Sequence, residues 1–225
     1  MAKASTHSVV GIRSAILEGD WSPGQRLQPP VLASRFDTST TVIRESLTRL
    51  AGEGLVQIKP NRGFFVPELN LRELADITEL RCVNEELASA LATERGDLGW
   101  ESELIAAHHK LGRIPRHLSE SPVVLNPEWG LAHREFHQLL LAPCDCAPML
   151  TLSANLANST LLYRRWAATS DAANSRDVER EHEMLLEAAL ARNARGLATL
   201  LREHYEESVR VIMNAGLLSA DPLNA

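Results

Sequence analysis

Four histidines in the second half of the chain are spaced so that a helical fold could bring them together. His133 and His137 are four residues apart, so on a helix their side chains point the same way. His182 and His204 lie eleven residues before and eleven residues after Asn193. If two helices form an antiparallel hairpin at Asn193, both histidines sit at one height, roughly 16 Å from the turn. Imidazoles that converge inside a bundle are suited to bind a transition metal.

The same histidines allow two other interpretations. Taken singly, each fits a surface residue or a buried residue with a hydrogen-bond partner. A bundle with a metal and an open position could also hydrolyse a substrate. A metalloprotease helix, however, needs Glu directly after the first His, and Glu135 lies about 100° further round the helix than that position. The sequence also has no nucleophile elbow, P-loop or dinucleotide-binding fingerprint, so we expect no enzyme activity.

A second group of residues, near the N-terminus, has side chains suited to contact DNA. Arg44 is the candidate for a bidentate contact to guanine, worth about 1–3 kcal/mol of discrimination. The other arginines fit phosphate contacts, which position a protein without reading sequence, although Arg49 could equally be a solvated or intradomain residue. Gly63 would allow close approach of the backbone to a minor groove. The candidate DNA-contacting residues are Arg35, Thr40, Thr41, Arg44, Arg49, Arg62 and Gly63.

Three helices must position these DNA-contacting residues. The first places its apolar residues on one face and closes at a Gly-Asp-Trp-Ser-Pro-Gly turn. Pro29 and Pro30 open a short second helix, and Ser39 is a candidate N-cap for the third. In the third helix Thr40, Thr41, Arg44 and Thr48 are left on the outer side. The inward-facing apolar residues of the first and third helices are Val9, Ile12, Ile16, Ile43, Leu47 and Leu50.

Two strands follow the third helix. Gly52 and Gly54 end that helix, and the segments 55–58 and 64–66 are rich in apolar and aromatic residues. The five residues Lys-Pro-Asn-Arg-Gly at 59–63 join them. Three helices and a two-stranded wing predict a winged helix-turn-helix, whose recognition helix lies in the major groove of DNA.

After a linker at 68–70, the chain has helical periodicity almost throughout. Apolar residues recur at spacings of three and four, as at Leu185, Leu186, Ala189 and Leu190. We expect helices near 71–95, 100–119, 127–141, 146–169, 175–192 and 196–214. The pattern predicts an all-α bundle with its own core. The chain is therefore expected to be mainly α, with a DNA-binding domain at 1–68 and a helical effector-binding and dimerisation domain at 69–225.

Charge is distributed unevenly between these two parts. Residues 1–68 hold 8 Lys and Arg against 6 Asp and Glu, a net charge of +2. The whole chain has 23 against 29, so the remainder has 15 against 23, a net charge of −8. The basic excess lies on the DNA-binding part but is small. Because phosphate contacts supply much of the binding energy, we expect two copies to bind one operator.

No targeting or membrane segment is expected. Residues 1–8 are polar and lack the apolar core of a signal peptide. No apolar run reaches 18 residues, so we expect a cytoplasmic protein without a membrane partner. The three cysteines form no disulfide framework, and we interpret them as small packing residues.

The first 68 residues resemble the DNA-binding domain of GntR-type bacterial repressors. Three departures stand out: Thr40 replaces the usual Arg, Val42 replaces the usual Pro, and Pro29 replaces a common Glu. Without that Arg the recognition helix lacks a second bidentate contact to guanine. We therefore expect an operator sequence that differs from the one typical of the family. The matching residues are Pro23, Gly24, Leu27, Leu32, Ala33, Ser39, Thr41, Arg44, Glu45, Leu47, Leu50, Glu53, Gly54, Leu55, Arg62, Gly63 and Val66.

The second part resembles the FCD ligand-binding domain of the FadR subfamily. The resemblance is carried by Arg81 and Glu85, Phe136-His137, Glu181-His182 and His204. It implies that His137, His182 and His204 are metal ligands, together with an Asp whose position is His133 here. Imidazole also ligates zinc or nickel, so we expect a divalent transition metal on four histidines. His108, His109 and His117 match no ligand position and are expected on the surface.

The FCD resemblance further implies that a small organic acid enters a pocket beside the metal. Arg81 is the natural partner for its carboxylate, because guanidinium binds carboxylate bidentately. Glu85 could instead pair with Arg81. Tyr163 and Arg165 are weaker effector-binding candidates, since they are equally expected on a solvent-exposed face of a helix. We expect a ligand-responsive transcription factor, a repressor acting as a homodimer on an inverted-repeat operator, rather than a structural DNA organiser.

Overall fold

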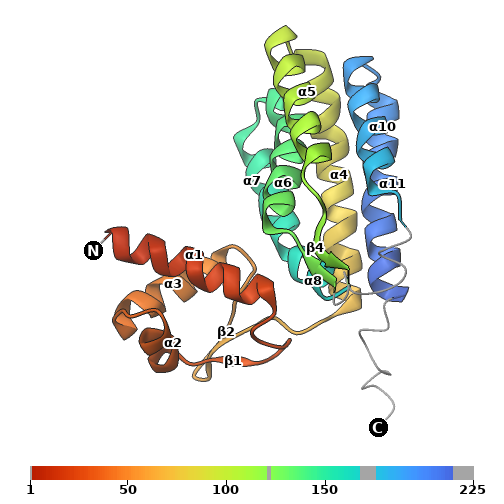
Figure 1. The fold of residues 1–225 in the computed structure, drawn as a ribbon. Coiled ribbons are helices and arrows are strands. Elements are labelled where there is room, and N and C mark those ends of the chain that lie inside the picture. The colour runs from red at the N-terminus through yellow and green to blue at the C-terminus, as the bar shows by residue number, and fades with distance from the viewer. Residues whose placement is uncertain (1, 121–122, 168–175, 215–225) are drawn as a thin grey trace. The chain divides into compact units, whose positions relative to one another are not determined.

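The computed structural model describes residues 2–120, 123–167 and 176–214. By their contacts, these residues form two compact units. The first comprises Met1–Leu71 and Ala157–Trp166, and the second comprises Arg72–Leu156 and Ala167–Ala225. Figure 1 shows the elements of each unit, which are described separately. None of the helices in the described ranges is long and apolar enough to cross a membrane.

The helices of the first unit are α1 (Ala2–Glu18), α2 (Pro29–Arg35) and α3 (Thr40–Gly52). Helix α3 begins where the sequence predicts, because the Ser39 hydroxyl accepts a hydrogen bond from the Val42 N–H at 3.3 Å. The helix ends at two glycines, and Gly54 has a φ of +77°. The apolar face of α3 packs on α1. Both helices contribute buried side chains to the core, among them Ile12, Ile16, Ile43, Leu47 and Leu50.

The wing is an antiparallel sheet of β1 (Arg26–Leu27), β2 (Gln57–Lys59) and β3 (Gly63–Phe65), in the order β1-β3-β2. Ile58 pairs with Phe64 across β2 and β3. The predicted winged helix-turn-helix is confirmed, with strand bounds that differ by one or two residues from the expected 55–58 and 64–66. Strand β1 was not expected, because two residues are too short for periodicity to be detected.

One segment far along the chain belongs to the first unit. Helix α8 (Leu161–Ala167) follows α7 (Ala147–Ser159) after a break at Thr160, so the single helix expected over 146–169 is wrong. Leu162 is buried in the core formed by α1 and α3. The Tyr163 hydroxyl accepts a hydrogen bond from the Asn70 N–H at 3.1 Å. Residues 168 and 169 lie outside the described residues.

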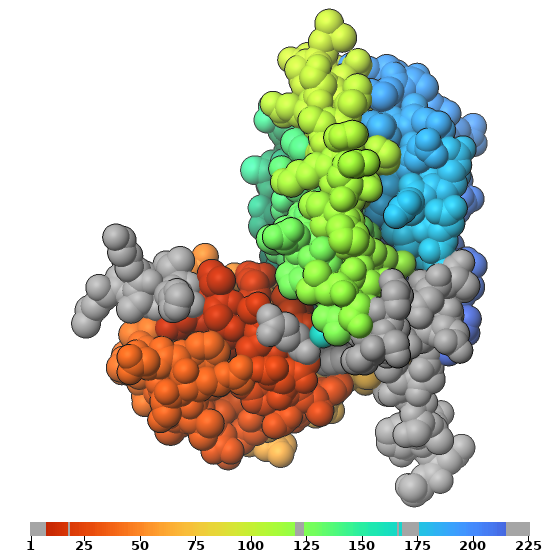
Figure 2. Space-filling model, in the orientation of Figure 1, coloured from red at the N-terminus to blue at the C-terminus, as the bar shows by residue number. Residues whose placement is uncertain are grey.

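The second unit is a helical bundle. In Figure 1 its long helices run along one common direction, and in Figure 2 α5 forms a ridge along the visible face of this unit. The predicted core is confirmed, with Phe136, Leu104, Leu140 and Leu185 fully buried. The three cysteines are free, and two of them are buried. The remaining helices are α4 (Leu71–Arg95), α5 (Leu98–Arg113), α6 (Pro127–Leu141), the 3-10 turn η1 (Ala142–Cys144), α10 (Val178–Leu190) and α11 (Ala194–Asn214).

A β-hairpin interrupts the bundle where a helix was expected. The helix predicted over 100–119 ends at Arg113, and β4 (His117–Glu120) pairs antiparallel with β5 (Val123–Leu125). Pro115 explains the difference, since the residue before a proline disfavours helical angles; Ile114 is extended, with φ −94° and ψ 121°. The expected break at 121–122 lies outside the described residues.

The last two helices form the hairpin that the histidine spacing requires. The Asp177 carboxylate accepts the Arg180 N–H at 2.9 Å, so α10 begins at Val178 rather than at the expected 175. Residue 175 lies outside the described residues. Helix α11 begins at Ala194, two residues earlier than expected. At the turn the Asn193 side chain accepts the Gly196 N–H at 2.9 Å.

Candidate metal centre and DNA-contacting surface

The bundle brings the four spaced histidines into one cluster. His133 and His137 lie on α6, His182 on α10 and His204 on α11. All four are buried, and one ring nitrogen from each lies within 4.8 Å of the others. The Nε2 atoms of His137 and His182 are 3.4 Å apart. The ring centroids of His182 and His204 are 5.0 Å apart, as expected for equal heights on a helical hairpin.

Local packing holds the α6 histidines toward the cluster. Asn126 caps α6 by accepting the Glu128 N–H at 3.0 Å, and Pro127 occupies its first turn. Trp129 lies one turn before His133 and stacks on its ring, with centroids 4.8 Å apart and planes 29° apart. Trp129, His133 and His137 therefore share one face of α6. Trp129 was not singled out from the sequence, although its spacing of four residues from His133 marks the same face.

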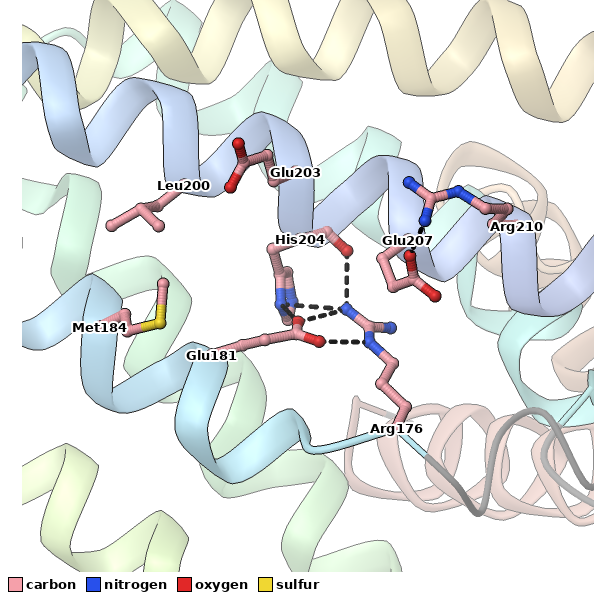
Figure 3. A pocket seen from close by; sticks show the side chains of 8 residues that line it. All are labelled: Arg176, Glu181, Met184, Leu200, Glu203, His204, Glu207 and Arg210. Carbon is pink, nitrogen blue, oxygen red and sulfur yellow. Dashed lines mark hydrogen bonds and ion pairs between the residues drawn. The ribbon is translucent and has the colours of Figure 1, made fainter.

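Hydrogen-bond partners outside the cluster, one a carboxylate and one a hydroxyl, orient two of the rings. The Glu181 Oε2 atom lies 2.6 Å from His204 Nδ1, and Glu181 is itself bound by Arg176 (Figure 3). A carboxylate accepts rather than donates, so Glu181 favours the tautomer of His204 with its proton on Nδ1, although the Arg176 guanidinium also lies 3.2 Å from this nitrogen. In that tautomer Nε2 carries the lone pair that a metal bond needs. His137 Nδ1 lies 3.3 Å from the Tyr205 hydroxyl. Such outer hydrogen bonds are typical of metal-binding histidines.

A buried ion pair between Arg81 and Glu85 contacts Tyr205. The Tyr205 hydroxyl donates to Glu85, and burial raises the pKa of Tyr205 well above its ordinary value. Glu85 also accepts from Arg81 Nε at 2.8 Å, and the Arg81 guanidinium lies over the Tyr205 ring at 3.8 Å. Burial opposes the charge of Arg81, but Tyr205 and Glu85 outweigh it and raise its pKa. Of the two alternatives for Glu85, the structure therefore shows the pairing with Arg81.

The cluster has the chemistry of a transition-metal site. Burial lowers the pKa of His182 to about 3, so its ring is neutral, as a ligand must be. Nitrogens bound to a tetrahedral ion at ~2.0–2.1 Å are ~3.4 Å apart. The Nε2 atoms of His137 and His182 have that separation, and the whole set of four ligand nitrogens lies within 4.8 Å. The four residues therefore fit a divalent ion, which would be held by their inward nitrogens.

The other two effector-binding candidates, Tyr163 and Arg165, stay predictions. Tyr163 and Arg165 are on α8, in a segment that belongs to the first unit. Tyr163 is buried, and its hydroxyl is bonded to the backbone of Asn70. Two arginines that the sequence reasoning missed act on the cluster. Arg116 lies over Trp129 at 5.6 Å, and the positive charges of both Arg116 and Arg176 lower the pKa of His182.

A hollow of about 550 Å³ opens between α10 and α11, on the outer side of His204 (Figure 3). Arg176, Glu181, Met184 and Glu203 are among its lining residues. The Arg176–Glu181 pair and His204 thus line this hollow together. Glu181 was noted in the sequence as part of Glu181-His182, but its contact with His204 could not be inferred from that pattern.

His108, His109 and His117, which match no ligand position, differ in exposure. His109 is exposed, as expected, whereas His108 and His117 are half-buried. The His108 ring lies 5.6 Å from that of Phe136, and burial lowers the pKa of His108. The expectation that all three lie on the surface therefore holds fully for His109 and only partly for the half-buried His108 and His117.

In the first unit, α3 presents a polar face to solvent. Thr41, Arg44 and Thr48 are exposed, and Thr40 is half-buried. The Thr48 hydroxyl donates to the Arg44 carbonyl at 2.9 Å. This face lies opposite the buried apolar face of α3, so Arg44 is available to a ligand outside the domain.

The other candidate arginines of the first unit are exposed but engaged with neighbours. Arg35 pairs with Asp20, and its guanidinium lies over the Trp21 ring at 5.1 Å. Arg49 Nε is 3.7 Å from a Glu53 carboxylate oxygen, as the intradomain alternative expects. Arg62 lies over the Phe65 ring at 5.8 Å.

The tip of the wing has the backbone freedom that its sequence predicts. Gly63 has a φ of +100°, and Asn61 has a φ of 57°. An arginine missed in the sequence, Arg26 of β1, lies beside this tip: a Cβ at Gly63 would be 3.7 Å from Arg26 Nη2. Arg26 is a further candidate for a phosphate contact, and only the pairing of β1 with β3 shows it.

Comparison with known proteins agrees with both units. Residues 9–66 match the family described as bacterial regulatory proteins, gntR family, and residues 76–207 match the FCD domain. The chain is 33% identical over 207 residues to the uncharacterized HTH-type transcriptional regulator BphR of Paraburkholderia xenovorans (strain LB400), covering 92% of this chain and 84% of that protein. It is 27% identical over 207 residues to the HTH-type transcriptional repressor GlaR of Escherichia coli (strain K12), covering 91% and 93%.

The solved structures show the same fold. The E. coli McbR/YncC structure superposes with a TM-score of 0.75 at 22% identity, covering 95% of this chain and 99% of that one. This likeness establishes the fold alone. Together with the sequence matches, it shows that the chain belongs to the gntR family of bacterial regulatory proteins, carries an FCD domain, and is a DNA-binding transcriptional regulator rather than an enzyme.

Proposed function

We propose that this regulator is a repressor whose homodimer binds an inverted-repeat operator and is released by a small carboxylate. The carboxylate would bind beside a divalent metal held by His133, His137, His182 and His204. One observation supports this most directly: four buried imidazoles from α6, α10 and α11 converge in the second unit. A family relative, GlaR, is named a repressor, which supports the direction of control.

In the proposed DNA complex, α3 enters the major groove. Arg44 faces the base edges, and the wing tip at Gly63 approaches the adjacent minor groove. Arg26, Arg35 and Arg62 lie where phosphate contacts would fix the register. Residues 1–68 have a net charge of only +2, so the electrostatic attraction between one copy and the DNA phosphates is weak. Two copies on one operator would supply the affinity for DNA that one copy lacks.

In the proposed homodimer, a face of α4 packs on its counterpart. Leu80, Val83 and Leu87 are 48%, 53% and 57% exposed, and their spacing places them on one side of the helix. The other side of α4 buries Leu74 and Cys82 within the same chain. A helix that is apolar on both sides needs a second partner, and a second copy supplies an identical apolar stripe.

Size-exclusion chromatography with light scattering tests this dimer. Val83→Glu is expected to give the mass of one chain, because it would bury a carboxylate between two apolar stripes. Leu131→Glu, on α6, is the matched control, because Leu131 is 64% exposed and lies on another helix. A dimer in both variants would contradict the role of α4.

The effector would be anionic because of the charge around the cluster. None of the four clustered ligand atoms is a carboxylate or thiolate. A divalent ion held there would therefore keep its full charge. With five or six ligands in place of the tetrahedral four, it would also offer a Lewis-acidic position to a carboxylate oxygen. Arg116 and Arg176 add positive charge that lowers the pKa of His182, whereas the nearby Glu181 carboxylate has a larger effect in the opposite direction.

Coupling between effector and DNA is the property to test. The metal-loaded protein is titrated onto an operator fragment by fluorescence anisotropy, with and without each of a panel of small organic acids. An effector is expected to weaken operator binding by about 5–150-fold, which corresponds to a coupling free energy of ~1–3 kcal/mol. By reciprocity, DNA must weaken effector binding by the same factor. If every acid that binds leaves operator affinity unchanged, the proposed release mechanism is wrong.

A further inference from the structure

The metal-binding cluster differs from a mixed site in having nitrogen donors only. Within the described ranges, the group of clustered ligand atoms consists of four imidazole nitrogens. Two nearby carboxylates are kept one step away. Glu181 bonds to the outer nitrogen of His204, and Glu85 reaches His137 through the Tyr205 hydroxyl. Negative charge therefore supports the rings but supplies no ligand atom.

His133 is built into this donor set. It is 8% exposed, and its ring centroid lies 4.5 Å from that of His137 and 4.9 Å from that of His182. Trp129 stacks on His133 from the preceding turn of α6, and Arg116 in turn lies over Trp129. This packing restricts the rotation of the His133 ring, so the fourth nitrogen is held at the cluster before any ion binds.

We infer that His133 makes this site selective for late transition ions and excludes manganese and magnesium. The inference rests on the metal site of the proposed function. Neutral imidazole suits zinc, nickel, copper and iron, whereas carboxylate and water oxygens suit magnesium and manganese. With four nitrogens and no anionic ligand, Mn²⁺ loses the oxygen donors that it prefers, while Ni²⁺ and Zn²⁺ keep their bonds to nitrogen. An aspartate at position 133 would restore a hard, charged donor.

Metal competition on the full chain tests the inference. The protein is stripped with a chelator, dialysed against equimolar Mn²⁺, Co²⁺, Ni²⁺ and Zn²⁺, and analysed by mass spectrometry of the bound elements. The unaltered chain is expected to retain Ni²⁺ or Zn²⁺ with Mn²⁺ at background. His133→Asp is expected to lower the ratio of Ni²⁺ to Mn²⁺ affinity by about tenfold or more. His109→Asp makes the same substitution at an exposed histidine of α5 and is expected to leave the ratio unchanged.

A spectrum of the Co²⁺-loaded protein tests the ligand role of His133 independently. Replacing a nitrogen ligand by oxygen weakens the ligand field, so His133→Asp is expected to shift the visible bands to longer wavelength. Identical spectra, or equal ratios of Ni²⁺ to Mn²⁺ affinity in His133→Asp and the unaltered chain, would overturn the inference while leaving the metal site itself in place.

The unaltered chain also tests the inference without any variant. If it binds Mn²⁺ as tightly as Ni²⁺, the all-nitrogen set does not select, and the inference is overturned even where His133→Asp fails to fold. If it binds none of the four ions, the metal site of the proposed function fails as well. The two failures are therefore distinguishable.

Discussion

Replacing Glu181 by glutamine tests how far the outer hydrogen bonds control the proposed metal site. The carboxylate lies 2.6 Å from His204 Nδ1 and favours the proton on that nitrogen, which leaves Nε2 as the inward ligand atom. A glutamine side chain would present either an oxygen or an NH₂ group to Nδ1, so both ring tautomers would become populated. The substitution would also remove the ion pair with Arg176, and the arginine would then lie against His204 without its countercharge.

The expected loss follows from this geometry. Outer carboxylate partners of metal-binding histidines typically contribute about 10–100-fold to affinity, so metal binding should weaken by ~1.4–2.7 kcal/mol. Arg176 is 10% exposed and Glu181 26% exposed in their side chains, so solvent screens the contact only partly. We therefore expect the upper half of that range. The other three imidazoles are unaltered, so binding should weaken rather than vanish.

The assay is a competition titration in which a chromophoric chelator and the protein share Ni²⁺. Glu183→Gln is the matched control. It makes the same change two residues along α10, where Glu183 is 51% exposed and pairs with Arg180 on the surface. Its metal affinity should equal that of the unaltered chain. If Glu181→Gln and Glu183→Gln bind Ni²⁺ equally well, the reasoning from tautomer control is refuted.

Three further predictions concern the DNA-contacting surface, the start of α3 and the cysteines. Arg44→Ala should lose about 1–3 kcal/mol of preference for the operator over unrelated DNA, while Arg49→Ala should keep that preference; anisotropy at fixed salt measures both. Ser39→Ala should lower the free energy of unfolding by ~1 kcal/mol in a denaturant titration, because the Val42 N–H loses its acceptor. In native protein at about pH 8, a thiol reagent should modify half-buried Cys146 first. Cys82 should stay unmodified, because burial raises its pKa to about 11 and keeps the thiol protonated; modification of Cys82 at the rate of Cys146 would contradict that.

Local sequence determined much of what this protein is. The apolar periods of α1 and α3, the Ser39 cap and the glycine at the wing tip depend on residues close together in the chain, and each could be predicted. The equal spacing of His182 and His204 from Asn193 likewise required only a hairpin. Helical rise is constant, so equal counts from a turn give equal heights.

Tertiary structure decided what depends on distant partners. Strand β1 exists because β3 pairs with it, and the hairpin at β4 and β5 has strands too short to show a period. The sequence left open whether Glu85 pairs with Arg81, and the folded chain shows this pair, while the role of Arg81 toward an effector stays a prediction. The proton position on His204 depends on Glu181, which is 23 residues away in sequence and 2.6 Å away in space. Hydrogen bonds and burial act over ångströms, and only the folded chain sets those distances.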